Sequence, residues 1–291
     1  MPVVRTIAFL TLLLAGGGCA YLRPPPTDGK GASAVRDLTT VRQVLQAADA
    51  DSAHLLLTQI GRVDAAGLDA PIWRMAYRPF QPDLKQVLVL AGLHGNETAG
   101  VECVLALIQR LRAAPGPGTR FDMDILPLVN PWGWVHDRPL TRAGVDIATD
   151  FSAFDSQEAR VIRRFLREKR YDLVLDLRED PAARGFYLRQ YGMDDTGVAL
   201  RAVERIRAAG HPVEHDPGGI LLSPREGIAA TPLWGLKLLR LTRRLTIAGY
   251  IRQSVSSSVI TVVTPAALPL SERVAMQQAA VETLLAELAA P

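Results

Sequence analysis

The stretch QVLVLAGLHGNE, residues 86–97, runs from an apolar segment into a polar turn. Residues 86–93 are almost continuously apolar, which predicts a strand covered on both faces. Apolar side chains then recur with helical spacing, so a helix is predicted over residues 97–111. The positions that carry this spacing are Val101, Val104, Leu105, Ile108 and Leu111. A buried strand that leads directly into a helix is the building unit of α/β folds.

The same alternation of strands and helices continues along the rest of the chain. Further strands are predicted at residues 55–57, 72–77, 121–129, 171–177, 186–191 and 258–263. Further helices are predicted at residues 41–48, 155–170, 194–209 and 270–288. We therefore predict a single α/β domain over residues 37–291, with a mostly parallel, mixed sheet covered by helices on both faces. A chain of 291 residues can build one large core without a second domain.

The N-terminus has the features of a secretion signal. Arg5 precedes an apolar stretch at residues 7–15, and small residues lead to Cys19. We predict that residues 1–19 form a signal of the lipoprotein type, in which Cys19 is lipidated and anchors the protein to a membrane. The alternative is ordinary cleavage near Cys19 and release into the periplasm. Both predict a location outside the cytoplasm.

A tether and a folded domain are expected to follow this signal. Residues 20–36 are rich in Pro, Gly and polar side chains, which is typical of a linker. Cys103 is the only other cysteine, so no disulfide within the chain is expected once Cys19 is lipidated. Cys103 lies in an apolar helical segment and is predicted to be a core residue.

The charge distribution argues against a nucleic-acid partner. The net charge is only +3, and no group of arginines alternates with aromatic residues. Basic residues do alternate with leucines across residues 236–245, at Lys237, Arg240, Arg243 and Arg244. That pattern predicts an amphipathic helix with its basic face in water, and contact with a membrane surface is the alternative. The sequence makes no prediction of oligomeric state.

His94 and Glu97 form a candidate metal site. They lie three residues apart in the turn that follows the strand of residues 86–93, where the small Gly95 permits a tight bend. An imidazole and a carboxylate are good zinc ligands, and functional groups of open α/β sheets collect at strand ends. An isolated pair of this kind could also be a surface histidine beside a glutamate that caps a helix.

Four further segments extend the pattern around this pair. They are NPWG at residues 130–133, GVDIATDF at 144–151, DLR at 176–178 and TVVTP at 261–265. Together with GLHGNE they resemble the zinc carboxypeptidase family and its aspartoacylase-like relatives, over residues 56–288. The resemblance implies a zinc-carboxypeptidase-like fold and hydrolysis of peptide or N-acyl bonds.

The resemblance also assigns roles to individual positions. It makes His94 and Glu97 two zinc ligands and places a third ligand at position 178. It places the general base at position 263. Arg138 and Arg142 lie in the loops that would contact a substrate carboxylate.

Three of these functional positions depart from the family pattern. The third ligand is replaced by Arg178, whose guanidinium has no lone pair to offer a metal. The base is replaced by Val263, which cannot accept a proton. The Asn-Arg pair that would bind a substrate terminus is replaced by residues 148–149, Ala-Thr. The resemblance implies zinc as the cofactor, whereas Arg178 argues against zinc binding, and no other cofactor is implied.

We hypothesise that Arg178 takes the place of the metal. Its guanidinium would pair with Glu97, because a buried carboxylate is costly when unpaired. Asp176 and Asp180 are further potential partners, since residues 176, 178 and 180 share one face of a strand. The alternative is that Arg178 points into solvent.

Three functions remain open at this point. The first is a catalytically degenerate protein that binds or regulates peptides or cell-envelope fragments. The second is an active zinc hydrolase, in which Asp180 or Asp176 replaces the third ligand, Glu179 or Glu226 replaces the base, and Arg138 or Arg142 holds the substrate. The third is a structural lipoprotein whose pocket binds nothing.

Overall fold

The computed structural model describes residues 35–65, 67–113, 120–192, 197–215, 227–256 and 258–289. The predicted signal at residues 1–19 and the tether, apart from residues 35 and 36, lie outside these ranges, as does Glu226. Within them, no helix combines the length and the apolar character needed to cross a membrane.

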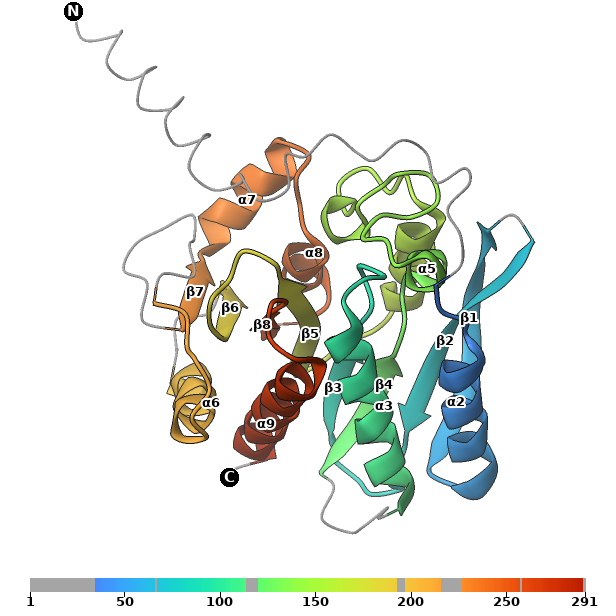
Figure 1. Cartoon of the computed structure of the whole chain (residues 1–291), viewed down its shortest axis with the longest axis horizontal. Helices are drawn as coiled ribbons and strands as arrows, with labels where there is room; N and C mark the ends of the chain where they lie inside the picture. Colours follow the sequence, from blue (N-terminus) through green and yellow to red (C-terminus); the bar gives the residue numbers. More distant parts are fainter. Residues whose placement is uncertain are drawn as a thin grey trace, which may run out of the picture.

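One eight-stranded sheet forms the centre of the molecule (Figure 1). Its strands are β1 (Leu55–Ala65), β2 (Leu68–Tyr77), β3 (Lys85–Leu90), β4 (Phe121–Leu126), β5 (Leu173–Asp180), β6 (Tyr187–Tyr191), β7 (Ile228–Thr231) and β8 (Val259–Pro265). They lie in the order β1-β2-β4-β3-β5-β8-β6-β7. Neighbours are parallel from β4 through β3 and β5 to β8 and again between β6 and β7, and the other pairs are antiparallel. The predicted mixed α/β sheet in a single domain is therefore confirmed.

Helices cover both faces of the sheet. One face carries α2 (Thr39–Asp51), α3 (Thr98–Ala113), α9 (Leu270–Ala289) and α6 (Gly197–Ala208), which lie side by side in that order (Figure 1). The other face carries α5 (Gln157–Leu166), α7 (Leu233–Leu241) and α8 (Ile247–Ser254). Val87 and Val89 of β3 pack into the first layer, whereas Leu88 and Leu90 pack into the second, as the two-residue period of a strand requires.

Two strand ends differ from the predicted bounds, and both differences shape the site. β3 ends at Leu90 rather than at residue 93, because Gly92 takes a positive φ of 64° and turns the chain. β5 continues to Asp180 rather than stopping at residue 177, because β8 pairs with it as far as Pro265. Residues 91–97 are thereby released into a loop, and Arg178 is held inside a strand.

Four short elements were not predicted from the sequence: α4 (Pro131–His136), the 3-10 helix η1 (Ile147–Thr149), β7 and α8. β7 has only four residues and depends on pairing with β6. Cys103 is a buried free cysteine in α3, as predicted, and burial raises the pKa of its thiol to about 12.

Candidate functional site

The site lies where the parallel strands end. His94 and Glu97 follow β3, Asn130 follows β4, Arg178 lies near the end of β5, and Val263 lies beside it on β8. Carboxyl ends of parallel strands lie at one edge of a sheet, so four segments distant in sequence converge there. This is the edge at which the sequence placed the site.

Two glycines hold the loop of residues 94–97 against α4. A side-chain Cβ atom on Gly95 would overlap the backbone of Gly133, so only glycine allows the two backbones to touch. The Gly95 amide donates to the carbonyl of Arg138 (3.0 Å), and the Gly133 amide donates to the Asn130 side chain (2.8 Å). Contact between the two backbones therefore fixes the shape of this loop.

The guanidinium of Arg178 points at Glu97 and His94. Its Nε donates to Glu97 Oε2 (2.7 Å) and its Nη2 to Glu97 Oε1 (3.2 Å), which is a two-pronged ion pair. The same Nη2 lies 2.8 Å from Nδ1 and 3.2 Å from Nε2 of His94. The alternative in which Arg178 points into solvent is wrong, because only 11% of its side chain is exposed.

His94 lies between two carboxylates. Its Nδ1 is 2.7 Å from Glu97 Oε1, and its Nε2 is 2.9 Å from Asp146 Oδ1. Burial lowers the pKa of His94 and Arg178 lowers it further, but the charge of Glu97 and the hydrogen bonds to Asp146 and Glu97 outweigh both, so the pKa is raised. The raised pKa favours a protonated His94 between the carboxylates of Glu97 and Asp146.

Both carboxylates have lowered pKa values. Burial raises the pKa of Glu97, but the charges of Arg178 and His94 overcome this effect. Burial likewise opposes the ionisation of Asp146, but its contacts with His94 and the charge of Arg178 bring its pKa to about 2. Glu97 and Asp146 therefore remain ionised at neutral pH.

Asp146 is a site residue to which the sequence analysis assigned no role. The signal was its place in the GVD segment, but a sequence separation of 52 from His94 hides their contact. Its Oδ1 accepts the amide of Ala148 (2.9 Å), and its Oδ2 accepts the hydroxyl of Thr149 (3.1 Å). The Ala-Thr pair that replaces a substrate anchor thus holds Asp146 toward His94.

These residues do not fit a zinc ion. A catalytic zinc site needs three protein ligands with free lone pairs, bound at about 2.0–2.2 Å. His94 and Glu97 offer such atoms, but the guanidinium occupies the space in front of both. Arg178 is a permanent cation without an acceptor, so it would repel the metal rather than bind it.

Glu179 and Asp180, which were candidates for the base and for the third metal ligand, make other contacts in the structure. Glu179 faces the opposite side of the sheet, where its carboxylate accepts the Ala99 amide (2.6 Å) and pairs with Arg273. Asp180 accepts the amide of Ala182 (2.8 Å) and the hydroxyl of Tyr187 (2.9 Å). Glu179 is thus turned away from the site as a base, and the Asp180 side chain bonds to Ala182 and Tyr187 rather than to His94 or Glu97 as a ligand would.

Asp176 lies on the same strand face as Arg178 and is fully buried. Thr261 Oγ1 is 3.4 Å from its Oδ2, and its Oδ1 has no hydrogen-bond partner. Burial raises the pKa of Asp176 to about 6, although Arg178 lowers it in part. The hydrogen bond of Asp176 is thus with Thr261, whereas Arg178, two residues further along β5, contacts both His94 and Glu97.

An apolar contact and a buried amide complete the surroundings of Arg178. Val263 is buried and packs with Tyr187 and Ala229, so no proton acceptor stands at the position of the general base. The Gln277 side chain of α9 donates to the Arg178 carbonyl (3.0 Å), which ties β5 to that helix. Gln277 carried no signal in the sequence, because its partner is 99 residues away.

Arg138 and Arg142 lie in the loop between α4 and the short 3-10 helix η1 (Ile147–Thr149). Both side chains are exposed, and no described carboxylate pairs with either of them. The backbone of Arg138 contacts Gly95, which places this residue next to the loop of His94. Their predicted contact with a substrate carboxylate stays a prediction.

Comparisons with known proteins agree with this fold. Residues 83–215 match the family model of the succinylglutamate desuccinylase/aspartoacylase catalytic domain. No curated protein matches the chain.

Several solved structures share the fold. A candidate metallopeptidase from Shewanella amazonensis SB2B has a TM-score of 0.70 at 19% identity, over 87% of this chain and 93% of that one. A metallo-carboxypeptidase from Burkholderia cenocepacia has a TM-score of 0.61 at 18% identity, over 86% of this chain and 68% of that one. Carboxypeptidase A from Helicoverpa armigera has a TM-score of 0.67 at 17% identity, over 99% of this chain and 82% of that one. The chain therefore has the zinc-carboxypeptidase-like fold, and its residues 83–215 match the catalytic domain of the succinylglutamate desuccinylase/aspartoacylase family.

Proposed function

We propose that this protein is a catalytically degenerate relative of the metallocarboxypeptidases that binds peptides or cell-envelope fragments without hydrolysing them. The observation that carries the proposal is the ion pair of Arg178 with Glu97, formed where a metal would be bound. The guanidinium keeps the loop of residues 94–97 in place, as a cation does in a metal site. Hydrolysis by such a site needs an activated water molecule. Among the described residues, Arg178 stands at the third ligand position and Val263 at the position of the base, and neither can activate water.

Arg138 and Arg142 favour a carboxylate ligand. Two exposed guanidinium groups on the loop next to His94 can bind the carboxylate of a peptide terminus with paired hydrogen bonds. Arg178 is already paired with Glu97, so it would not compete for such a ligand. We propose that binding occurs outside the cytoplasm, with the protein held at the membrane through Cys19 or released into the periplasm.

Two assays on the natural sequence test this proposal. Short peptides and N-acyl amino acids should show no hydrolysis, with or without added zinc. The peptides should nevertheless raise the unfolding temperature, since a ligand at 100 times its Kd stabilises a protein by about 2.7 kcal/mol.

Arg138→Ala with Arg142→Ala should abolish this stabilisation, whereas Arg164→Ala with Arg167→Ala, which removes two exposed arginines of the α5 region, should not. Zinc-dependent hydrolysis that is lost in His94→Ala would replace the proposal with an active enzyme. No response to any peptide would favour a structural lipoprotein instead.

A further inference from the structure

Helix α7 exposes an unusual amount of apolar surface. Eight large apolar side chains of the described residues are well exposed, and four of them lie on this one nine-residue helix. They are Leu233, Trp234, Leu238 and Leu241. Trp234 is 51% exposed and Leu241 is 81% exposed. Clustered exposed apolar residues mark an interaction surface, whereas isolated ones do not.

The exposed residues form a second apolar face on the helix. At 100° per residue, Trp234, Leu238 and Leu241 lie within about 60° of one another. The side that packs on the protein carries Gly235 and Leu236, about 100–200° around the helix axis from Trp234. The exposed stripe therefore faces away from the core.

Basic side chains accompany this stripe. Lys237 and Arg240 lie on α7 between its two apolar faces, and Arg243 and Arg244 follow in the next turn. No Asp or Glu occurs from residue 227 to residue 271. Within the described ranges, none of these four cations is paired with a carboxylate. The surface is thus both apolar and uniformly positive.

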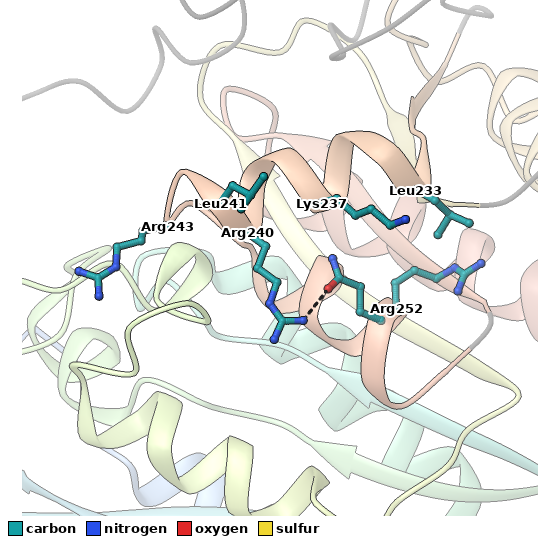
Figure 2. Close-up of a pocket in the computed structure, with 7 residues that line it drawn as sticks. Leu233, Lys237, Arg240, Leu241, Arg243 and Arg252 are labelled. Carbon is teal, nitrogen blue, oxygen red and sulfur yellow. Dashed lines mark hydrogen bonds between the residues drawn. The ribbon is translucent and has the colours of Figure 1, made fainter.

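A hollow of about 870 Å³ continues the positive surface between α7 and α8 (Figure 2). Lys237 and Arg240 line it, and Arg240 reaches Gln253 (3.3 Å). Arg252 also lines it, but its guanidinium is bound to the carbonyls of Tyr191 and Gly192 (2.8 and 2.7 Å). The hollow places further positive charge next to the exposed stripe.

We propose that α7 and the turn after it dock on the surface of an anionic lipid membrane. Trp234, Leu238 and Leu241 would enter the boundary between headgroups and acyl chains, and the basic side chains would lie against lipid phosphates. An amphipathic helix with lysines and arginines beside Trp and Leu is suited to that interface. A second copy of the chain is a poor occupant, because it would bring two positive surfaces together.

Vesicle sedimentation of the full-length chain tests this proposal. Vesicles of phosphatidylcholine with phosphatidylglycerol should bind the protein more tightly than vesicles of phosphatidylcholine alone. Each basic residue near an anionic surface strengthens binding about fivefold, so the triple change Lys237→Gln, Arg240→Gln and Arg243→Gln should weaken it on the order of a hundredfold. The N-terminal segment is the same in all variants, so differences between them report on α7.

Matched variants elsewhere on the surface serve as controls. Arg164→Gln, Arg167→Gln and Arg170→Gln remove the same charge from exposed positions in and after α5, and should change binding far less. Trp234→Ser with Leu241→Ser should lower binding at least tenfold, whereas Leu56→Ser with Phe80→Ser, at similarly exposed positions, should leave it unchanged.

Fluorescence gives a second and independent measurement. Of the four tryptophans, Trp73, Trp132 and Trp134 are buried, so a shift of emission to shorter wavelength on anionic vesicles would come from Trp234. The shift should disappear in Trp234→Phe. Equal binding to neutral and anionic vesicles, or full binding by either α7 variant, would overturn the proposal. Binding to an acidic protein with no affinity for vesicles would overturn it as well.

Discussion

Replacing Arg178 by histidine should convert the site into one that responds to zinc. The change removes the guanidinium and adds an imidazole at the third ligand position. Without metal, the loss of one partner of a buried ion pair costs about 3–5 kcal/mol in general. Here the lower value, about 3 kcal/mol, applies, because Glu97 keeps its contact with His94.

The expected change in unfolding temperature follows from that value. A domain of this size shifts by about 2–4 °C per kcal/mol, so metal-free Arg178→His should unfold about 6–12 °C below the natural protein. Zinc at 100 times its Kd should then restore about 2.7 kcal/mol, nearly the whole loss. Differential scanning fluorimetry with and without zinc measures both effects.

Arg178→Gln is the matched control, since it removes the same charge without adding a ligand. It should lose the same stability and gain nothing from zinc, and the natural protein should not respond to zinc either. Stabilisation of the natural protein by zinc would show that Arg178 does not exclude the metal. An Arg178→His variant as stable as the natural protein and indifferent to zinc would also contradict the prediction.

Two further predictions concern the framework. Asp124 is buried beside the guanidinium groups of Arg74 and Arg78; burial opposes its ionisation, but these contacts lower its pKa in the folded state. Ionised Asp124 therefore contributes to the free energy of unfolding above the pKa that it has in the unfolded chain, and this contribution is lost as pH falls through its pKa in the folded state. Asp124→Asn should cost about 3 kcal/mol at neutral pH. The free energy of unfolding of this variant should also fall less steeply with pH on the acid side. Gly95→Ala should destabilise the protein by about 3 kcal/mol, because its Cβ atom would overlap the backbone of α4. Gly235→Ala in α7 should stabilise it by about 0.5–1 kcal/mol, because a Cβ atom there meets nothing closer than 3.6 Å. Urea unfolding of both variants measures the difference, and equal effects would contradict the packing argument.

Sequence periodicity predicted the strands at the centre of the sheet. The segments of β3 and β5 are buried on both faces, so their apolar runs can be recognised from the sequence without knowing which strands they pair with. It also predicted which end of the sheet carries the site. The exact strand ends were not predictable, since the end of β5 depends on its pairing with β8. The short strand β7 depends in the same way on β6.

Within the site, the pairing of Arg178 with Glu97 followed from electrostatics, because a buried carboxylate without its metal needs another cation. The contact of Asp146 with His94 did not follow, since no local pattern reports which loop folds over the ring. The basic pattern around α7 was visible in the sequence, but the exposure of Leu238 and Leu241 was not. A leucine at helical spacing is usually buried, and only the packing of α7 shows otherwise.

The central claim is that a guanidinium occupies the place of the metal. Its most direct test is the metal content of the natural protein, purified without chelators from cells grown with zinc and measured by mass spectrometry. We expect far less than one zinc per chain, and close to one in Arg178→His purified in parallel. One tightly bound zinc per chain in the natural protein would contradict the claim.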